Sequence, residues 1–199
     1  YGCSKGAADQ YVHDYARTYG MTTTCFRQSC IYGRRQFGIE DQGWVAWFTI
    51  AAVLGRRITL YGNGKQVRDV LDVDDLCRLY DAAVERPDVS GGQIFNVGGG
   101  PLHQLSLLEL VEKLERLTGH RLDLVYANTR VGDQPLFVSD ISKAQRDLQW
   151  QPAFGLDAGL ERLYRWIFDN RETFAEYHQK PLAAAAMVPD TACHHDSPT

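Results

Sequence analysis

The chain alternates between stretches with a helical period of apolar residues and short runs rich in β-branched and aromatic residues. The clearest helix follows Ser106, which forms a capping-box pattern with Glu109 ahead of an apolar face that ends at Gly119. Further helices are predicted over residues 5–19, 44–54, 74–84, 142–148 and 156–170. Strands are predicted over residues 21–27, 58–62, 67–73, 93–99 and 121–126, with an extended segment at 136–138. The alternation predicts an α/β protein without internal repeats.

The pattern does not contain the beginning of a dinucleotide-binding half. Such a half begins with a strand, a glycine-rich turn and a helix, and an acidic residue follows about 20 positions later. The nearest match is GGGPLH at residues 98–103, where His103 stands in the place of the third glycine. We interpret this segment as a loop on the substrate side, so the start of a cofactor-binding domain is expected to lie outside the sequence.

Composition and charge narrow the class of protein. The 199 residues are 44% apolar and 23% charged, with a formal net charge of -4. This balance is typical of a mildly acidic globular protein and argues against a nucleic-acid partner. The longest apolar stretch, residues 44–54, is too short to cross a bilayer, and no basic-then-apolar signal precedes it. A cytoplasmic location without membrane attachment is therefore expected.

The cysteines and the final segment indicate no structural metal or disulfide framework. Five cysteines occur without a CxxC pair or a regular spacing, which favours reduced thiols. Residues 178–199 have small residues and no apolar period, so a disordered tail is expected there. This tail contains Cys193, His194 and His195, but metal binding needs ligands that a fold holds rigidly, so no metal site is predicted.

The opening stretch YGCSK places Tyr1 and Lys5 one helical turn apart, on the same side of a helix. A nearby ammonium favours the phenolate form of a tyrosine and lowers its pKa, so this tyrosine could act as a general base. A tyrosine and a lysine at this spacing are common on amphipathic helices, however, and the spacing alone favours a solvated helix face.

The larger pattern resembles a known family. The segments YGCSKGAADQY, FRQSCIYG, GNGKQVRDVLDVDDL, FNVGGG and DQPLFVSDISKAQRDLQWQP follow one another as in the extended short-chain dehydrogenase/reductases. Within that family they resemble the NAD-dependent nucleotide-sugar epimerases and dehydratases. Residues 1–20 and 26–48 are similar, more narrowly, to the CDP-tyvelose (CDP-paratose) 2-epimerases. The resemblance implies the carboxy-terminal part of a Rossmann-like α/β enzyme, with late Rossmann elements and a nucleotide-sugar-binding lobe over residues 1–177.

The resemblance also implies a reaction and a cofactor. A tightly held NAD would oxidise a sugar carbon to a ketone and return hydride to the opposite face. Tyr1 would serve as the general base and acid, while Lys5 would tune it and reach the cofactor ribose. Ser29, Cys30 and Ile31 would lie near the nicotinamide. Family members also pair through the helix that bears the tyrosine, so a homo-oligomer is expected.

A second set of residues is expected on the substrate side. Arg68 would hold the substrate diphosphate, because a guanidinium offers paired donors to phosphate oxygens. Arg130 matches another family position that contacts the nucleotide. Many relatives have asparagine where this chain has Ser29, which puts the sugar contact there in doubt. The full expected set is Ser29, Arg34, Arg35, Gln66, Arg68, Arg130 and Asp133, with solvent exposure an equal alternative for Arg34 and Arg35.

Several alternatives stay open at this level. The amino-terminal half could belong to the same polypeptide or to a docking chain, or the chain could be a non-catalytic fragment that binds nucleotide sugar. Without a glycine-rich phosphate turn, these residues alone are expected to bind NAD poorly. A dehydratase or a 4-epimerase of the same family is the alternative activity. The nucleotide base, the sugar and the inverted carbon depend on pocket shape, which spacing does not reveal.

Overall fold

The computed structural model of the protein describes residues 2–179; Tyr1 and residues 180–199 lie outside this range. The helices are α1 (Gly2–Tyr19), α2 (Trp44–Val53), α3 (Val73–Val84), α4 (Pro87–Ser90), the 3-10 helix η1 (Gly100–His103), α5 (Leu107–Thr118), α6 (Ser142–Leu148), α7 (Leu156–Asp169) and α8 (Arg171–Gln179). The strands are β1 (Cys25–Gln28), β2 (Cys30–Tyr32), β3 (Ile58–Tyr61), β4 (Val67–Asp72), β5 (Ile94–Val97), β6 (Gln104–Ser106), β7 (Leu124–Ala127) and β8 (Leu136–Phe137). The predicted α/β class is confirmed.

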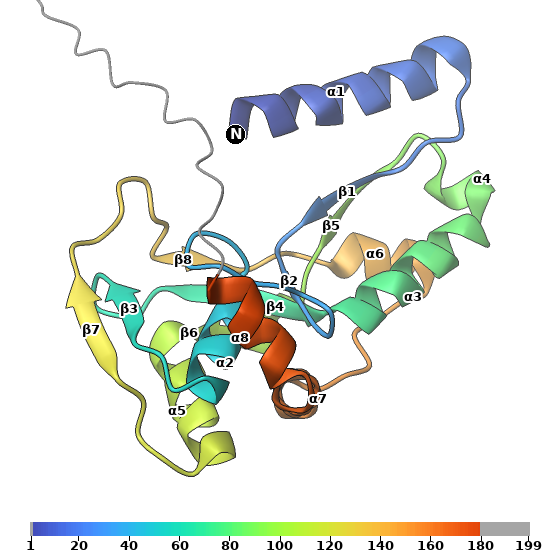
Figure 1. Ribbon diagram of the computed structural model, residues 1–199. Coiled ribbons are helices and arrows are strands. Elements are labelled where there is room, and N and C mark those ends of the chain that lie inside the picture. The colour runs from blue at the N-terminus through green and yellow to red at the C-terminus, as the bar shows by residue number, and fades with distance from the viewer. Residues whose placement is uncertain (1, 180–199) are drawn as a thin grey trace, which may run out of the picture.

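Strand β4 lies at the centre of the fold (Figure 1). It pairs in parallel with β2 and β8 and antiparallel with β6. Two further parallel pairs, β1 with β5 and β3 with β7, lie on either side of it. Side chains of successive strand residues point to opposite faces, so Val70 and Leu71 of β4 enter two different cores.

The two cores divide the helices between them. Val70 belongs to the larger core, which α2, α5, α7 and α8 build with β3 and β6. Leu71 belongs to the smaller core, which α3, α6 and β5 build. Helix α2 is apolar on nearly all sides because the larger core surrounds it, and its length is only 10 residues. No helix within residues 2–179 combines the length and apolar character that a membrane crossing requires.

Helix α5 begins and ends as its sequence predicts. The Ser106 hydroxyl accepts from the Glu109 backbone N–H at 3.2 Å, and the Glu109 carboxylate accepts from the Ser106 backbone N–H at 2.8 Å. Gly119 ends the helix in the left-handed conformation at φ 77°, where a side chain would be strained. The capping box is therefore confirmed on both of its hydrogen bonds.

The first turn of α3 contains Asp74 and Asp75, but neither of them is the capping residue. The capping residue is Asp72, whose carboxylate accepts from the Asp74 backbone N–H at 2.8 Å. Asp75 is fully buried, and its carboxylate accepts from the backbone N–H groups of Ala153 and Phe154 at 2.9 and 3.0 Å. Asp75 thus connects α3 to the segment before α7, a long-range role that local sequence patterns do not encode.

One predicted strand begins later in the structure than expected, and one observed strand was not predicted. The predicted strand 21–27 begins only at Cys25, whose backbone N–H donates to the Gln93 carbonyl at 2.9 Å, whereas the Thr23 backbone N–H donates locally to the Met21 carbonyl at 2.9 Å. The segment 28–42, for which no strand was predicted, contains β2, whose three residues are too few to give a periodic signal.

Helix α8 was missed by the sequence pattern. Phe174 is fully buried and stacks on Phe37 with ring centroids 4.6 Å apart. It also meets Trp166 of α7 edge-on at 5.3 Å. A single fully buried aromatic residue anchors this helix. One buried position does not form an apolar period that a sequence pattern can reveal. The predicted boundary between residues 177 and 178 falls inside α8, and the rest of the expected tail, residues 180–199, lies outside the described range.

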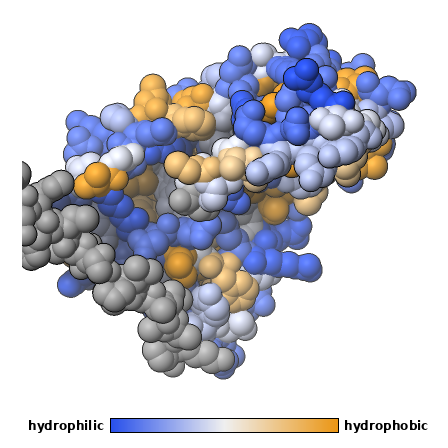
Figure 2. Space-filling model, turned by 90° about the horizontal axis from the view of Figure 1, so that it is seen from above, coloured by the Kyte–Doolittle hydropathy of each residue, from blue (hydrophilic) through white to orange (hydrophobic). Residues whose placement is uncertain are grey.

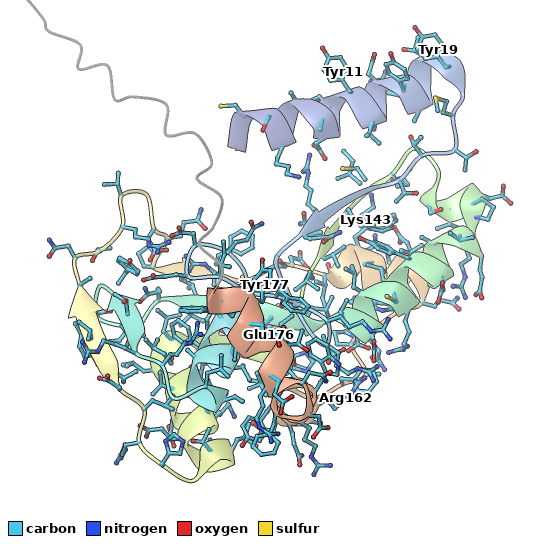
Figure 3. The ribbon with its side chains drawn as sticks, in the orientation of Figure 1. Tyr11, Tyr19, Lys143, Arg162, Glu176 and Tyr177 are labelled. Carbon is cyan, nitrogen blue, oxygen red and sulfur yellow. The ribbon has the colours of Figure 1, made fainter. Side chains whose placement is uncertain are left out.

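Helix α1 lies along one side of the β1–β5 pair and has no buried residue (Figure 1). Tyr11 and Tyr19 point away from the rest of the protein (Figure 3). Seen from the α1 side, the surface is mainly hydrophilic, with hydrophobic residues in separate groups (Figure 2). Asp9 attaches the helix to β1, since its carboxylate pairs with Arg27 at 2.5 Å and accepts from the Cys25 thiol at 2.6 Å.

This attachment should weaken in acid. Hydrogen bonds from Arg27 and then Cys25 lower the pKa of Asp9 to about 2, from an ordinary value of 3.8. A carboxyl whose pKa is lower in the folded state stabilises the fold above its unfolded pKa, and this contribution is lost as the pH falls through the folded pKa. We expect amide exchange in α1 to accelerate between about pH 4 and about pH 2, relative to α5.

The variant Asp9→Asn is the control for this pH effect. It should show faster exchange in α1 already at neutral pH and little further change in acid, because its side chain does not titrate. An acid-induced acceleration in α1 that is equally large in Asp9→Asn would assign the effect to other carboxyl groups.

Candidate functional site

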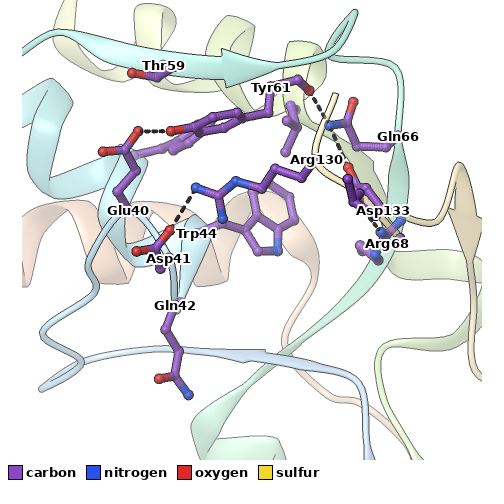
Figure 4. A pocket seen from close by; sticks show the side chains of 15 residues that line it. Glu40, Asp41, Gln42, Trp44, Thr59, Tyr61, Gln66, Arg68, Arg130 and Asp133 are labelled. Carbon is purple, nitrogen blue, oxygen red and sulfur yellow. Dashed lines mark hydrogen bonds and ion pairs between the residues drawn. The ribbon is translucent and has the colours of Figure 1, made fainter. Parts of the chain in front are cut away.

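A pocket of about 330 Å³ opens beside the end of β3, at the amino-terminal end of α2 (Figure 4). The loops 33–43 and 128–135 form its sides, β4 contributes Arg68, and Gln66 lies just before β4. It is lined by Glu40, Asp41, Gln42, Gly43, Trp44, Phe48, Thr59, Tyr61, Gln66, Arg68, Leu107, Arg130, Val131, Gly132 and Asp133. A cavity of this size falls within the range of small-molecule sites.

Arg68 is held firmly at one end of the pocket. Its guanidinium donates to the backbone carbonyls of Val67 and Gln134 at 2.9 and 2.6 Å and pairs with Asp133 at 2.7 Å. The Asp133 carboxylate also accepts from the Gln66 side chain at 3.2 Å. Three connected side chains and two carbonyls therefore fix the position of this positive charge.

Arg130 lies over the other end of the pocket. Its guanidinium carbon is 3.9 Å from the centroid of the Tyr61 ring, and one nitrogen pairs with Asp41 at 2.8 Å. Interaction with the Tyr61 hydroxyl and with Asp41 raises the pKa of Arg130 above its ordinary value. The cation is thus stabilised over an aromatic face at the mouth of the cavity (Figure 4).

Aromatic side chains form the apolar part of the pocket. Phe48 is buried and meets the ring of Trp44 edge-on at 6.1 Å. The Tyr61 hydroxyl donates to the Glu40 carboxylate at 2.9 Å, which fixes the ring beneath Arg130. Aromatic faces next to two guanidinium groups can stack a planar heterocycle and bind its phosphates at the same time.

A second cavity of about 500 Å³ continues from the first and shares Tyr61, Gln66 and Asp133 with it. Its other lining residues are mainly polar and come from the turn after β3 and the loop 128–135. The two cavities together offer an apolar part, two arginines and a polar extension that includes Lys65.

The structure brings four of the expected substrate residues together: Gln66, Arg68, Arg130 and Asp133 all line the pocket. Arg34 and Arg35 are not among its lining residues. Arg34 pairs with Asp74 at 3.0 Å, on the α3 side of the fold. Arg35 adopts the left-handed conformation at φ 68° and is exposed. The four arginines that the sequence groups around one ligand are therefore divided between two places.

Ser29 and Cys30 are not among the residues that line the pocket. The Ser29 hydroxyl donates to the buried Asp69 carboxylate at 2.5 Å. The Cys30 sulfur accepts from the Trp44 indole N–H at 3.4 Å, and burial raises the pKa of the thiol. A partly buried thiol with a raised pKa is a poor nucleophile. Ile31 pairs with Leu71 of β4.

The proposed catalytic pair is only partly described. Lys5 is exposed on the first turns of α1, and Tyr1 precedes the described residues. The helical conformation from Gly2 onward agrees with the spacing argument, since it continues through Lys5. The approach of the phenol to the ammonium stays a prediction.

The glycine turn after β5 is closed by packing. A Cβ at Gly98 would lie 2.0 Å from the Asp69 carboxylate, and one at Gly99 would lie 2.2 Å from the Val70 carbonyl. These glycines allow close contact with β4 rather than the approach of a ligand. The turn at residues 98–100 therefore does not fit a dinucleotide pyrophosphate. This agrees with the sequence interpretation, which did not assign the turn to cofactor binding.

Sequence reasoning missed part of the pocket. It placed Trp44 and Phe48 within a predicted helix and did not single out Glu40, Asp41 or Tyr61. The glycines around Tyr61 mark a turn but give no sign that its ring lies under Arg130, because that contact joins residues 69 positions apart. Within residues 2–179 no group of three or more His, Cys, Asp and Glu side chains is arranged to hold a metal ion. The CHH segment lies outside that range.

Comparison with known proteins decides the family. Residues 1–98 match the model of the NAD dependent epimerase/dehydratase family. Over 173 residues the chain is 44% identical to CDP-paratose 2-epimerase of Salmonella typhi, covering 83% of this chain and 51% of that protein. The chain belongs to the NAD dependent epimerase/dehydratase family.

Other members of the epimerase/dehydratase family show the same relationship. The chain is 31% identical over 183 residues to a dTDP-glucose 4,6-dehydratase of Neisseria gonorrhoeae, covering 86% of this chain and 51% of that protein. The crystal structure of a UDP-glucose 4-epimerase from Thermotoga maritima, with UDP-glucose, superposes with a TM-score of 0.78 at 31% identity, over 85% of this chain and 53% of that one. The chain thus spans about half the length of the relatives it matches.

Proposed function

We propose that this chain forms the nucleotide-sugar-binding part of an NAD-dependent epimerase, and that the substrate is a CDP-linked sugar inverted at C2. The observation that carries the proposal is the pocket in which Arg68 and Arg130 lie beside Trp44 and Tyr61. Two guanidinium groups match the two phosphates of a nucleoside diphosphate, and the aromatic rings suit its base.

The choice of substrate is supported by the relatives. The 44% identity to a CDP-paratose 2-epimerase exceeds the 31% identity to a dTDP-glucose 4,6-dehydratase over similar lengths. Specificity depends on individual pocket contacts, which identity alone does not fix. The CDP group and the inversion at C2 are therefore the parts of the proposal that experiment must test first.

Tyr1 is the proposed general base and Lys5 the residue that favours its phenolate, since the two residues are one helical turn apart. NAD, when bound, would take hydride from the sugar carbon and return it. The pyrophosphate of NAD would be held outside residues 2–179, since the glycine turn of this chain is closed. This chain would contribute the substrate diphosphate site and the proton-transfer pair.

The experiment is conversion of CDP-paratose by the polypeptide that contains this chain, with NAD, in deuterium oxide. Transient oxidation at one carbon returns the same hydrogen, so inversion at C2 without deuterium is expected. A parallel reaction with CDP-glucose, which has the C6 hydroxyl that the 6-deoxy sugar of CDP-paratose lacks, would identify a dehydratase by loss of water together with deuterium in the sugar. Inversion at C4 would identify a 4-epimerase. Binding of CDP-paratose without any conversion would leave a non-catalytic nucleotide-sugar-binding protein.

A further inference from the structure

Two arginine–aspartate pairs flank the pocket, and they differ in burial. In the pair of Arg68 with Asp133, the side chains are 18% and 24% exposed. In the pair of Arg130 with Asp41, they are 39% and 79% exposed. The distances are nearly equal, at 2.7 and 2.8 Å, so the difference lies in the surroundings of each pair and not in its geometry.

Asp133 is part of a connected structure. Its carboxylate receives both the Arg68 guanidinium and the Gln66 amide, and the neighbouring Gln134 carbonyl receives Arg68 as well. Removing this carboxylate would leave two half-buried donors without their acceptor, which is costly. Asp133 therefore holds Arg68 in place.

Asp41, in contrast to Asp133, is mostly exposed. It lies in the short turn closed by the bridge between Ile39 and Gln42, on the loop across the mouth from Arg130. Arg130 is the partner that the structure gives its carboxylate, and the Tyr61 ring supports the guanidinium independently. Exposed ion pairs of this kind contribute little to stability, so this one can be exchanged for another anion at small cost.

We propose that Asp41 occupies Arg130 in the free protein as a built-in competitor of the ligand phosphate. This inference rests on the proposed binding of a nucleoside diphosphate in this pocket. A phosphate that reaches Arg130 displaces the Asp41 carboxylate, and the displaced carboxylate then stands close to a dianion and repels it. Asp41 thereby lowers the affinity for diphosphates and eases release of a charged product, whereas Asp133 raises that affinity.

The test is calorimetric titration of the full chain and its variants with CDP, CMP and cytidine. Asp41→Asn should bind CDP about threefold more tightly than the unmodified chain and CMP by a smaller factor, with no change for cytidine. Asp133→Asn should bind CDP more weakly. Asp123→Asn is the matched control, because it changes the net charge equally and removes an exposed carboxylate that pairs with Arg57 at 2.9 Å. It should leave all three affinities unchanged.

Weaker CDP binding by Asp41→Asn would overturn the inference and make Asp41 a residue that positions Arg130. Equal gains in Asp41→Asn and Asp123→Asn would also overturn it, because net charge would then explain the effect. These outcomes presuppose that the unmodified chain binds CDP. Absence of CDP binding to the unmodified chain would instead contradict the proposed function, and the inference with it, so the two failures are distinguishable.

Discussion

Replacing Asp75 with alanine is expected to lower the free energy of unfolding by about 4 kcal/mol. The carboxylate is fully buried and accepts from the backbone N–H groups of Ala153 and Phe154, and it pairs with Arg78 at 2.5 Å. Alanine would leave two backbone donors without a partner where α3 meets the segment before α7. Urea denaturation followed by circular dichroism measures the change.

Two variants make this expectation specific. Asp75→Asn retains one oxygen acceptor, so about half of the loss is expected. Asp81→Ala removes an exposed carboxylate from the same helix, and its effect should stay within about 0.5 kcal/mol. Equal stabilities for Asp75→Ala and Asp81→Ala would show that the bonds to residues 153 and 154 do not stabilise the fold.

Replacing Arg68 with methionine is expected to weaken binding of CDP about 100-fold, because charge-assisted hydrogen bonds to phosphate are lost. The side chain is only 18% exposed, and Asp133 with the Gln134 carbonyl fixes its direction. The loss should appear for CDP and not for cytidine, which lacks phosphate. Calorimetric titration of both ligands measures it.

Arg68→Lys separates charge from geometry. Lysine keeps the positive charge but not the planar pair of donors, so a loss of about tenfold is expected. Circular dichroism of each variant verifies that the fold is intact. Equal weakening of CDP and cytidine by Arg68→Met would indicate a change in pocket shape and would contradict a direct phosphate contact.

The elements that the sequence predicted well are those with local signals. Helix α5 has its own cap, apolar face and terminal glycine, so its limits follow from neighbouring residues. Strand β2 and helix α8 were missed because each is stabilised by distant residues: β2 by pairing with β4, and α8 by Phe174 on Phe37. Strand β1 likewise begins at Cys25 because that residue is the first to pair with β5.

The site residues also fall into two groups, those that a local motif identifies and those whose contacts depend on distant residues. Gln66 and Arg68 lie within one motif, Asp133 begins another and Arg130 matches a family position just before it, so resemblance could place all four on the ligand side. In the structure all four line one pocket, and their contact with a ligand stays a prediction. Spacing could not show that Arg34 pairs with Asp74 away from this pocket, or that Asp41 pairs with Arg130. These partners are set by the path of the loop 33–43.

The central claim is that this chain carries the nucleotide-sugar end of the active site and not the dinucleotide cradle. The most direct measurement is one calorimetric experiment in which the chain is titrated with CDP and, separately, with NAD. The account predicts that CDP saturates the chain at one molar equivalent, while NAD binds weakly or gives no heat. Tight binding of NAD at one equivalent, with no binding of CDP, would contradict it.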